Sequence, residues 1–521
     1  LGDETQMYKD SWNRVTRTKR QTGSIMKTIG VVSPVIESGK LTAATGLNDA
    51  PIKRGSYKHK NYTGRFQGWM TLRHALELSE NIPQIRALQE IGIDTSYKFL
   101  KKMNFPVTED DKNLGALALG GLQHGATVQD MVGAYGMIAN DGVFSKPTYI
   151  KKITDNDGKE VYKNEPEKKQ VKMMSKEASF IVKDMLRGVI TSPSGTAGYA
   201  TIPNFDSAGK TGTTNDDYDR WFAGFTNKYT MAVWYGFDEV ETVVYRGNNP
   251  AGMIWTGAMR EIHKGLQGEK FEEPKEIVKM DVCGVSGKKP TAACSLDPRG
   301  TKVYSEYFVK GTEPKDECDI HQFVEVCKES GLLPSKECRP EDKERRVFIK
   351  QDVDGAEDTK YRAPSRVCDQ CSSANRQKTE EAKRKIENIN SVLSGNVENM
   401  TSKDISRYEN AISVYNSLSS EDKEKVSKEA KSNISAAQEK IKKLKEETEN
   451  NNSKAKQEGK TVMDLIAALP EASSITAANK ASASSSASNA RAKYNALSQE
   501  AKKNVTNYAK LKAVEDKIAE L

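Results

Sequence analysis

The chain has 521 residues, enough for about three or four domains. Because only 36% of the residues are hydrophobic while 29% are charged, part of the chain should lack a large hydrophobic core. The net charge of +8 is spread along the chain and no basic run is interleaved with aromatic residues, so we expect no nucleic acid as a partner. No apolar stretch approaches 18 residues and no signal peptide is visible, so we expect no transmembrane helix within the chain.

Residues 1–275 are predicted to form one globular domain of the α+β class. Apolar residues have helical spacing in 71–92, and 127–142 predicts a second helix with Thr127 as N-cap and Gly142 at its end. "MAVWYGF" (231–237) is aromatic and β-branched and predicts a strand, with 220–227 as its hairpin partner. Helices mixed with antiparallel strands indicate the α+β class. The domain holds all five tryptophans: Trp12, Trp69, Trp221, Trp234 and Trp255.

The next segment, residues 276–371, contains every cysteine of the chain. The seven thiols lie at irregular spacing, which favours disulfides formed outside the cytoplasm. A zinc site is the alternative, with Cys318-x-x-His321 and Cys368-x-x-Cys371 as ligands, although the gap between the two pairs is long for a compact finger. We therefore predict a loop-rich, cross-linked extension with at least one unpaired thiol. The cysteines are Cys283, Cys294, Cys318, Cys327, Cys338, Cys368 and Cys371.

From about residue 372 the composition changes to Lys, Glu, Ser, Asn and Ala. "YNSLSSEDKEKV" (415–426) matches "YNALSQEAKKNV" (494–505), which indicates an internal repeat. Ser419 and Ser498 are natural N-caps for the charged helices that follow. The pattern predicts two all-α repeats, 372–450 and 451–521, and leaves the Ser-rich stretch 480–491 as a loop or a weak helix.

The stretch "SAGKTGTT" (207–214) admits two kinds of chemistry. A phosphate-binding loop needs Gly, four residues, then Gly-Lys-Ser/Thr, but Asn204 occupies the position of the first glycine. The alternative is the Lys-Thr-Gly element of serine acyltransferases, which accompanies a Ser-x-x-Lys and a Ser-x-Asn element. Both companions occur upstream in the expected order, so the acyltransferase interpretation is favoured.

Ser24-Ile25-Met26-Lys27 supplies the first element and Ser79-Glu80-Asn81 the second. A serine and a lysine three residues apart share one face of a helix, so the amine can reach the hydroxyl. A second lysine, Lys210, holds positive charge near the first and lowers its pKa, which makes it a base. An isolated Ser-x-x-Lys is only a solvated helix face, as at Ser420 and Lys423, so the signal depends on all three elements together.

Longer stretches around these elements resemble the class A penicillin-binding proteins, the bifunctional peptidoglycan synthases. "NRVTRTKRQTGSIMK" (13–27) looks like their nucleophile segment, and "ALELSENIPQIRAL" (75–88) is similar to their second motif. Residues 117–144 and 194–238 resemble the segments that follow, so the likeness covers about half of the chain. Thr22 departs from the proline that the family usually has before Gly-Ser. The resemblance implies a penicillin-binding transpeptidase fold, an antiparallel sheet flanked by helices.

The resemblance also implies the roles of individual residues. Ser24 is the nucleophile and Lys27 its base, while Ser79 and Lys210 pass a proton to the leaving amine and Asn81 orients Lys27. The oxyanion hole is implied to consist of the backbone N–H groups of Ser24 and Thr213. Substrate binding falls to the end of the third motif: Thr211, Gly212, Thr213 and Thr214.

The implied reaction is D,D-transpeptidation of peptidoglycan pentapeptide stems, with β-lactams as ligands that acylate Ser24. No cofactor and no metal is expected in this reaction. The alternative within the same fold is a D,D-carboxypeptidase or a β-lactamase-type hydrolase. A second alternative is not an enzyme at all: a cell-envelope binding or structural protein with a vestigial catalytic domain. This alternative stays open because the repeats could be a spacer, or could bind wall polymer or a division or elongation protein.

The expected location is extracytoplasmic, in a Gram-positive-like envelope. The chain begins at Leu1 rather than Met, so we expect a fragment or processed chain whose glycosyltransferase domain and membrane anchor lie outside it. "CGVSGKKPTAAC" (283–294) and "YFVKGTEPKDECDIH" (307–321) resemble an extension of some clostridia-like members of the family, which supports this location.

Overall fold

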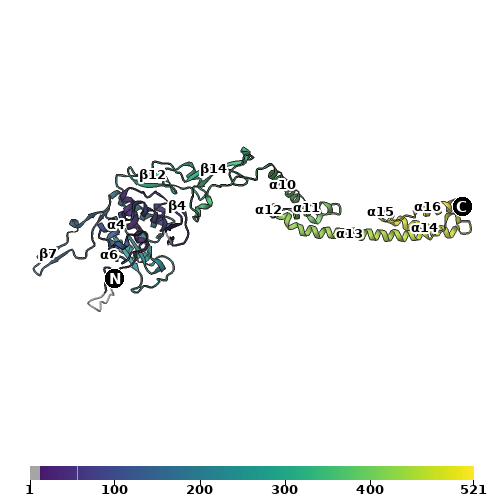
Figure 1. Ribbon diagram of the computed structural model, residues 1–521. Helices are drawn as coiled ribbons and strands as arrows, with labels where there is room; N and C mark the ends of the chain where they lie inside the picture. Colours follow the sequence, from purple (N-terminus) through teal and green to yellow (C-terminus); the bar gives the residue numbers. More distant parts are fainter. Residues whose placement is uncertain (1–11, 55–56) are drawn as a thin grey trace. The chain divides into compact units, whose positions relative to one another are not determined.

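The computed structural model describes residues 12–54 and 57–521, so the expectation drawn from Leu1 lies outside the described residues. The chain divides into two compact units (Figure 1). The first unit holds the residues up to Pro334 together with Arg339–Cys368, and the second holds Ser335–Cys338 together with Asp369–Leu521. No helix among the described residues is long and apolar enough to cross a membrane.

A three-stranded antiparallel sheet lies in the core of the first unit. Its middle strand pairs Arg220 with Thr213 on one side and with Tyr235 on the other, which confirms the predicted hairpin. Every residue of the middle strand is buried, because helices pack on the sheet. The strands are β9 (Ala208–Thr213), β10 (Arg220–Phe225) and β11 (Thr230–Tyr235), and the helices are α6 (Val128–Ala139), α7 (Lys176–Thr191) and α8 (Pro250–Ile262). The α+β fold class is confirmed.

The helical part of this unit is built as the sequence predicts, with one break. The helix expected over 71–92 is interrupted at Ser79, whose φ of 64° is left-handed, and helix formation resumes just before Pro83. Thr127 caps α6 as predicted, since its Oγ1 accepts the backbone N–H of Asp130 at 3.1 Å. The other helices are α1 (Ser33–Ser38), α2 (Leu72–Leu78), α3 (Ile82–Ile91), α4 (Ile93–Lys102) and α5 (Leu114–Leu119).

Short antiparallel pairs surround this core. The pair nearest to α2 is β1 (Gly46–Asp49) with β4 (Gly68–Thr71). The remaining pairs are β2 (Ile52–Arg54) with β3 (Tyr57–His59), β5 (Val143–Phe144) with β8 (Val171–Lys172), and β6 (Lys152–Thr154) with β7 (Glu160–Lys163). The short 3-10 turns outside the first motif are η3 (Glu109–Asp111), η4 (Pro166–Lys169), η5 (Asn215–Asp217), η6 (Pro340–Asp342), η7 (Glu357–Tyr361), η8 (Val397–Asn399) and η9 (Ala472–Ser474).

The Cys-rich extension, residues 276–371, is more regular than predicted. It contains two antiparallel pairs and a short helix: β12 (Ile277–Cys283) with β13 (Val303–Val309), β14 (His321–Cys327) with β15 (Lys343–Ile349), and α9 (Ala292–Ser295). The disulfide prediction is wrong, because all seven cysteines lie among the described residues, are buried and form no disulfide. The Sγ atoms of Cys283 and Cys318 lie 3.6 Å apart, whereas an S–S bond is about 2.05 Å long.

The second unit is all-helical, as predicted. Its helices are α10 (Ser373–Leu393), α11 (Ile405–Ser417), α12 (Ser420–Lys425), α13 (Lys428–Ala467), α14 (Lys480–Ala496), α15 (Gln499–Lys503) and α16 (Tyr508–Glu520). Ser419 and Ser498 cap α12 and α15, so both N-cap predictions are confirmed. The Ser-rich stretch is helical and lies in α14.

Two separate apolar clusters stabilise this unit, one built around Ile389 and Ile441 and the other around Ile466 and Leu511. The long helix α13 contributes to both (Figure 1). It therefore runs through the boundary that we proposed between residues 450 and 451. No proline or glycine interrupts α13 before Gly459, so its sequence has no signal for a stop there.

Candidate active site

The first motif lies in one helical run of changing pitch. Ser24 is half-buried within the 3-10 turn η1 (Gly23–Ile25), and Lys27 begins the π-helical segment η2 (Lys27–Val32), which continues into α1. The hydroxyl of Tyr135 donates to the carbonyl of Ile25 at 2.9 Å and holds this run against α6. Segments of π-helix occur frequently at functional sites.

Gly23 allows the segment of the first motif to approach the sheet. Its φ is 54°, and a Cβ placed on it would lie 2.4 Å from the carbonyl oxygen of Thr213. A side chain at position 23 would therefore separate η1 from β9. The close approach sets Ser24 beside the end of β9, which is the arrangement that the two proposed oxyanion-hole residues require.

The second motif occupies the junction between α2 and α3. Ser79 is in the left-handed conformation at the end of α2, a strained position that surrounding contacts must maintain. Asn81 is fixed on both sides, because its backbone N–H donates to Asn61 Oδ1 and its Nδ2 donates to the carbonyl of Lys60, each at 2.8 Å. Its Oδ1 is thereby left to accept from Lys27 Nζ, at 2.7 Å.

The third motif forms β9, and its lysine completes the group. Lys210 Nζ donates to Ser79 Oγ at 2.8 Å, while Lys27 Nζ lies 3.3 Å from the same oxygen and 2.5 Å from the carbonyl oxygen of Ser79. Ser79 Oγ thus lies between two amines that come from segments 183 residues apart. The structure brings Lys27, Ser79, Asn81 and Lys210 into one hydrogen-bonded group, with Ser24 one helical turn before Lys27.

The two amines have unusual electrostatics because both are fully buried. Burial lowers the pKa of Lys27 to about 7, although the charges of Glu80 and Asp49 oppose this shift. Burial, together with the charge of Lys27, lowers the pKa of Lys210 well below its usual value. A lysine with a pKa near 7 is in large part a neutral amine at physiological pH, so it can accept a proton.

The threonines of the third motif divide into two kinds. Thr211 and Thr213 are half-buried, and their hydroxyls contact Lys210 Nζ at 3.3 Å and Arg220 Nη1 at 3.1 Å. Gly212, between them, is buried against Ile25 and Trp221. Thr214 is also buried, and its Oγ1 accepts the backbone N–H of Asp219 at 2.9 Å. Because this hydroxyl is engaged in the turn before β10, the expectation that Thr214 binds substrate does not fit its position.

The motifs did not identify three residues that belong to this site. Arg220 faces Thr213 directly across the β9–β10 pair, so the hairpin register could have revealed it. The hydroxyl of Thr196 lies 3.0 Å from that of Thr211. Glu80 lies within the second motif, and burial and the charge of Asp49 raise its pKa to about 6. No local sequence pattern marks Thr196 or Glu80.

Two family models match the chain. Residues 2–254 match the penicillin-binding protein transpeptidase domain, and residues 273–323 match the C-terminal domain of penicillin-binding protein 1A.

Curated relatives support the same assignment. Penicillin-binding protein 1A of Clostridium botulinum strain Hall is 35% identical over 66% of this chain and 42% of that protein. Penicillin-binding protein 1A/1B of Bacillus subtilis is 30% identical over 62% of this chain and 37% of that protein. The chain spans about two fifths of the length of these relatives.

Among solved structures, the crystal structure of penicillin-binding protein 1A from Haemophilus influenzae is similar to this chain. The TM-score is 0.50 at 26% identity, with 59% of this chain and 50% of that chain covered.

Proposed function

Because the chain belongs to the class A penicillin-binding proteins, we propose that its first unit is a serine D,D-transpeptidase that cross-links peptidoglycan stem peptides. The observation that carries the proposal is the position of Ser79 Oγ, within 2.8 Å of Lys210 Nζ and 3.3 Å of Lys27 Nζ. We extend the proposal to the whole protein, which as a bifunctional synthase also polymerises glycan and acts outside the cytoplasm.

Acylation begins with the neutral amine of Lys27. Lys27 takes the proton of Ser24 Oγ while that oxygen attacks the carbonyl carbon of the penultimate D-Ala of a pentapeptide stem. The developing oxyanion is stabilised by the backbone N–H groups of Ser24 and Thr213. Asn81 supports the step because its Oδ1 accepts from Lys27 Nζ at 2.7 Å and thereby fixes the direction of the amine.

Collapse of the tetrahedral intermediate breaks the peptide bond and releases the terminal D-Ala. Its amine needs a proton, which Ser79 Oγ supplies while Lys210 is hydrogen-bonded to that oxygen at 2.8 Å. The protonated Lys27, 3.3 Å from Ser79 Oγ, restores the proton of Ser79, so the proton taken from Ser24 ends on the released D-Ala. The Lys27 amine suits this relay, because a group with a pKa of about 7 exchanges protons readily near neutral pH. The amine of a neighbouring stem then attacks the acyl-enzyme carbonyl, takes the place of the lost D-Ala and gives a proton to Lys27. The bond to Ser24 Oγ breaks, and Lys27 returns that proton to Ser24.

Substrate binding falls to the exposed edge of β9. We assign the substrate carboxylate to the hydroxyls of Thr211 and Thr213. Arg220 contacts the Thr213 hydroxyl at 3.1 Å and the Lys210 amine contacts the Thr211 hydroxyl at 3.3 Å. A carboxylate bound there would therefore be close to the positive charge of the Arg220 guanidinium. A β-lactam carries a carboxylate and a strained amide, so it acylates Ser24 by the same route.

The test is covalent labelling with a fluorescent penicillin, followed by mapping of the labelled peptide. We expect the label on the peptide that contains Ser24, its loss in S24A and its retention in S420A, which alters a Ser-x-x-Lys of the helical repeats. Labelling that persists in folded S24A would refute the assignment.

The lifetime of the acyl-enzyme separates the transpeptidase from a carboxypeptidase or β-lactamase-type hydrolase. A synthase should hold the penicilloyl group for many minutes. Rapid turnover of penicillin with the label released as the hydrolysed product would favour the hydrolase. A folded chain that takes up no penicillin would favour an envelope-binding protein with a vestigial catalytic domain.

A further inference from the structure

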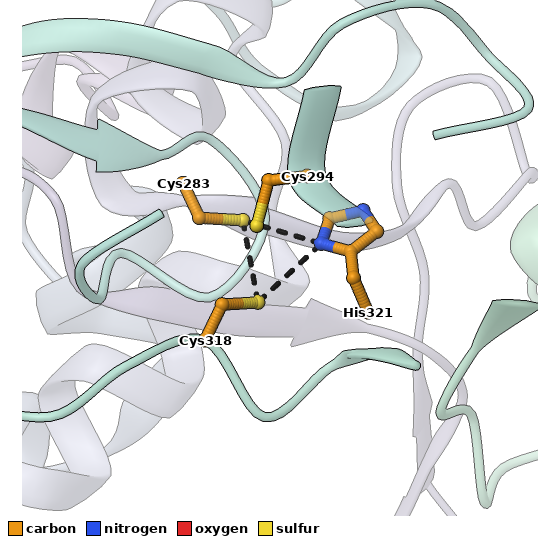
Figure 2. Close-up of side chains that lie close together, drawn as sticks. All are labelled: Cys283, Cys294, Cys318 and His321. Carbon is orange, nitrogen blue, oxygen red and sulfur yellow. Dashed lines mark hydrogen bonds between the residues drawn. The ribbon is translucent and has the colours of Figure 1, made fainter. Parts of the chain in front are cut away.

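Four metal-ligating side chains converge in the Cys-rich extension, outside the proposed active site. Cys283 ends β12, Cys294 lies in α9, Cys318 precedes β14 and His321 begins it. All four are buried, and their Sγ and imidazole nitrogen atoms lie within 4.8 Å of one another (Figure 2). We call these residues the Cys3His group. We propose that the Cys3His group binds one structural Zn²⁺ ion.

The distances within the group fit a tetrahedral ion. Zinc binds cysteine sulfur at about 2.3 Å and histidine nitrogen at about 2.0–2.1 Å, so tetrahedral edges are about 3.8 Å between two sulfurs and about 3.6 Å between sulfur and nitrogen. The Sγ atoms of Cys283 and Cys318 are 3.6 Å apart, and His321 Nδ1 lies 3.4 Å from each of them. One ion at the centre can therefore reach all of these atoms.

A second layer of contacts directs the imidazole toward the sulfurs. His321 Nε2 lies 2.6 Å from Asp297 Oδ2, and both side chains are completely buried. Arg299 holds this carboxylate through its Nε at 2.9 Å and its Nη2 at 2.7 Å. Donation from Nε2 leaves the lone pair on Nδ1, which points to the sulfurs in Figure 2. Histidine ligands of zinc are oriented by carboxylates in this way.

Backbone N–H groups are aimed at two of the sulfurs. The N–H of Ser286 lies 3.5 Å from Cys283 Sγ, and that of Thr291 lies 3.3 Å from Cys294 Sγ. Such contacts stabilise negative charge on sulfur, which a thiolate ligand carries and a neutral thiol does not.

Two simpler explanations of the Cys3His group, a disulfide and a cluster of neutral thiols, account for fewer of its contacts. A disulfide would join only two of the three thiols and would not explain the buried histidine and aspartate or the half-buried arginine that holds the aspartate. A cluster of neutral thiols packed with Val285 and Ile349 would need no charged network behind it. Three thiolates and one imidazole make a closed set of four ligands, which is typical of a structural zinc site rather than a catalytic one.

The zinc site considered from the sequence contained the wrong second pair of ligands. His321 does join Cys318, as the spacing Cys-x-x-His suggests, but Cys283 and Cys294 complete the group in place of Cys368 and Cys371. Cys283 and Cys294 are more than 20 residues away in sequence, on other elements, so spacing alone could not select them.

The proposed ion would also fix the extension against the transpeptidase domain. The turn Cys283–Gly287 packs on the segment before β1, since a Cβ on Gly287 would lie 1.8 Å from the carbonyl oxygen of Ala44. On the neighbouring strand, Glu306 of β13 pairs with Arg73 of α2. Because α2 ends at Ser79, the ion would support an element that carries the second motif.

The test measures bound zinc in the full chain after purification under reducing conditions. Compared with the parent chain, C283S/C318S should lose one equivalent of zinc, whereas H124N, which alters an exposed histidine elsewhere, should lose none. The other four cysteines are present in all three proteins, so the difference reports on the Cys3His group alone. Equal zinc in the parent and in folded C283S/C318S would overturn the proposal, as would free-thiol parent protein without zinc.

Two further variants keep the test decisive if the double variant does not fold. D297N should weaken zinc binding by about 10- to 100-fold in competition with a chelator, because it disturbs the residue that orients His321. H321C should retain the metal, and its Co²⁺-loaded form should show stronger thiolate charge transfer than the parent. An unchanged Co²⁺ spectrum in H321C, or an unchanged affinity in D297N, would overturn the assignment.

Discussion

Replacing Lys27 by Arg tests the proposed base directly. Burial lowers the pKa of Lys27 from 10.5 to about 7, so about half of the side chains are neutral at pH 7. A lysine at its usual pKa of about 10.4 would be neutral in only about 0.04% of molecules. Arginine has a pKa above about 12 and keeps its charge even when buried. K27R therefore preserves positive charge but removes the proton acceptor.

The expected loss follows from the role of a general base, which contributes about 10²- to 10⁴-fold to a rate. We expect the first-order rate constant for acylation by penicillin to fall by that factor in K27R. In the parent chain the same rate constant should rise with pH and level off above about pH 7, because the active form is the neutral amine and it accumulates as the proton is lost.

The assay is quenched-flow labelling with a fluorescent penicillin between pH 5.5 and 9. K423R is the matched control, since Lys423 belongs to the Ser-x-x-Lys of the helical repeats and should leave the rate unchanged. The reasoning is refuted if folded K27R is acylated within a few-fold of the parent rate. It is equally refuted if the parent profile inflects above pH 9, where an ordinary lysine titrates.

Three further changes probe other parts of the chain. T213V should lower the acylation efficiency for penicillin by about tenfold or more without moving the pH inflection, because a hydrogen bond to a charged carboxylate is worth about 1.5–3 kcal/mol. R73M should lower the free energy of unfolding in urea by about 3–5 kcal/mol, since Arg73 is the cation that pairs with the buried Glu306. S419A should speed amide exchange in α12 about fivefold, because losing an N-cap costs about 1 kcal/mol.

Matched controls separate these effects from general damage. T201V alters an exposed threonine outside the site and should leave acylation unchanged. E261A removes an exposed ion pair with Lys264 and should change the free energy of unfolding by about 0–1 kcal/mol. S432A lies on the exposed surface of α13 and should not alter exchange in α12. If a control variant changes the measured quantity as much as the variant that it is paired with, the corresponding reasoning is wrong.

Local patterns in the sequence determined much of the first unit. The strand at 231–237 and its hairpin partner followed from β-branched and aromatic residues, and the start of α6 followed from the Thr127 cap. The three motifs also supplied Lys27, Ser79, Asn81 and Lys210, which the structure joins in one hydrogen-bonded group. The cap and the strands were predicted correctly because each is specified by residues that are neighbours in sequence.

Other expectations depended on contacts that the motifs do not record. Thr214 carries the same side chain as Thr213, but its hydroxyl is engaged by Asp219, five residues further on in the same turn. The Cys-rich segment was predicted to hold disulfides, because composition counts thiols and cannot say how many of them meet at one point.

The sequence by itself thus determined which residue types the site uses and in which order they occur along the chain. Only the tertiary structure decided that Lys27 and Lys210 are both fully buried beside one serine hydroxyl, which is what lowers their pKa values. It also decided that one ring nitrogen of His321 contacts Asp297, while the other contacts the sulfurs of Cys283 and Cys318. The physical reason is the same for the two lysines and for the Cys3His group. Burial and proximity depend on how separate segments pack, and the spacing of residues along the chain does not specify that packing.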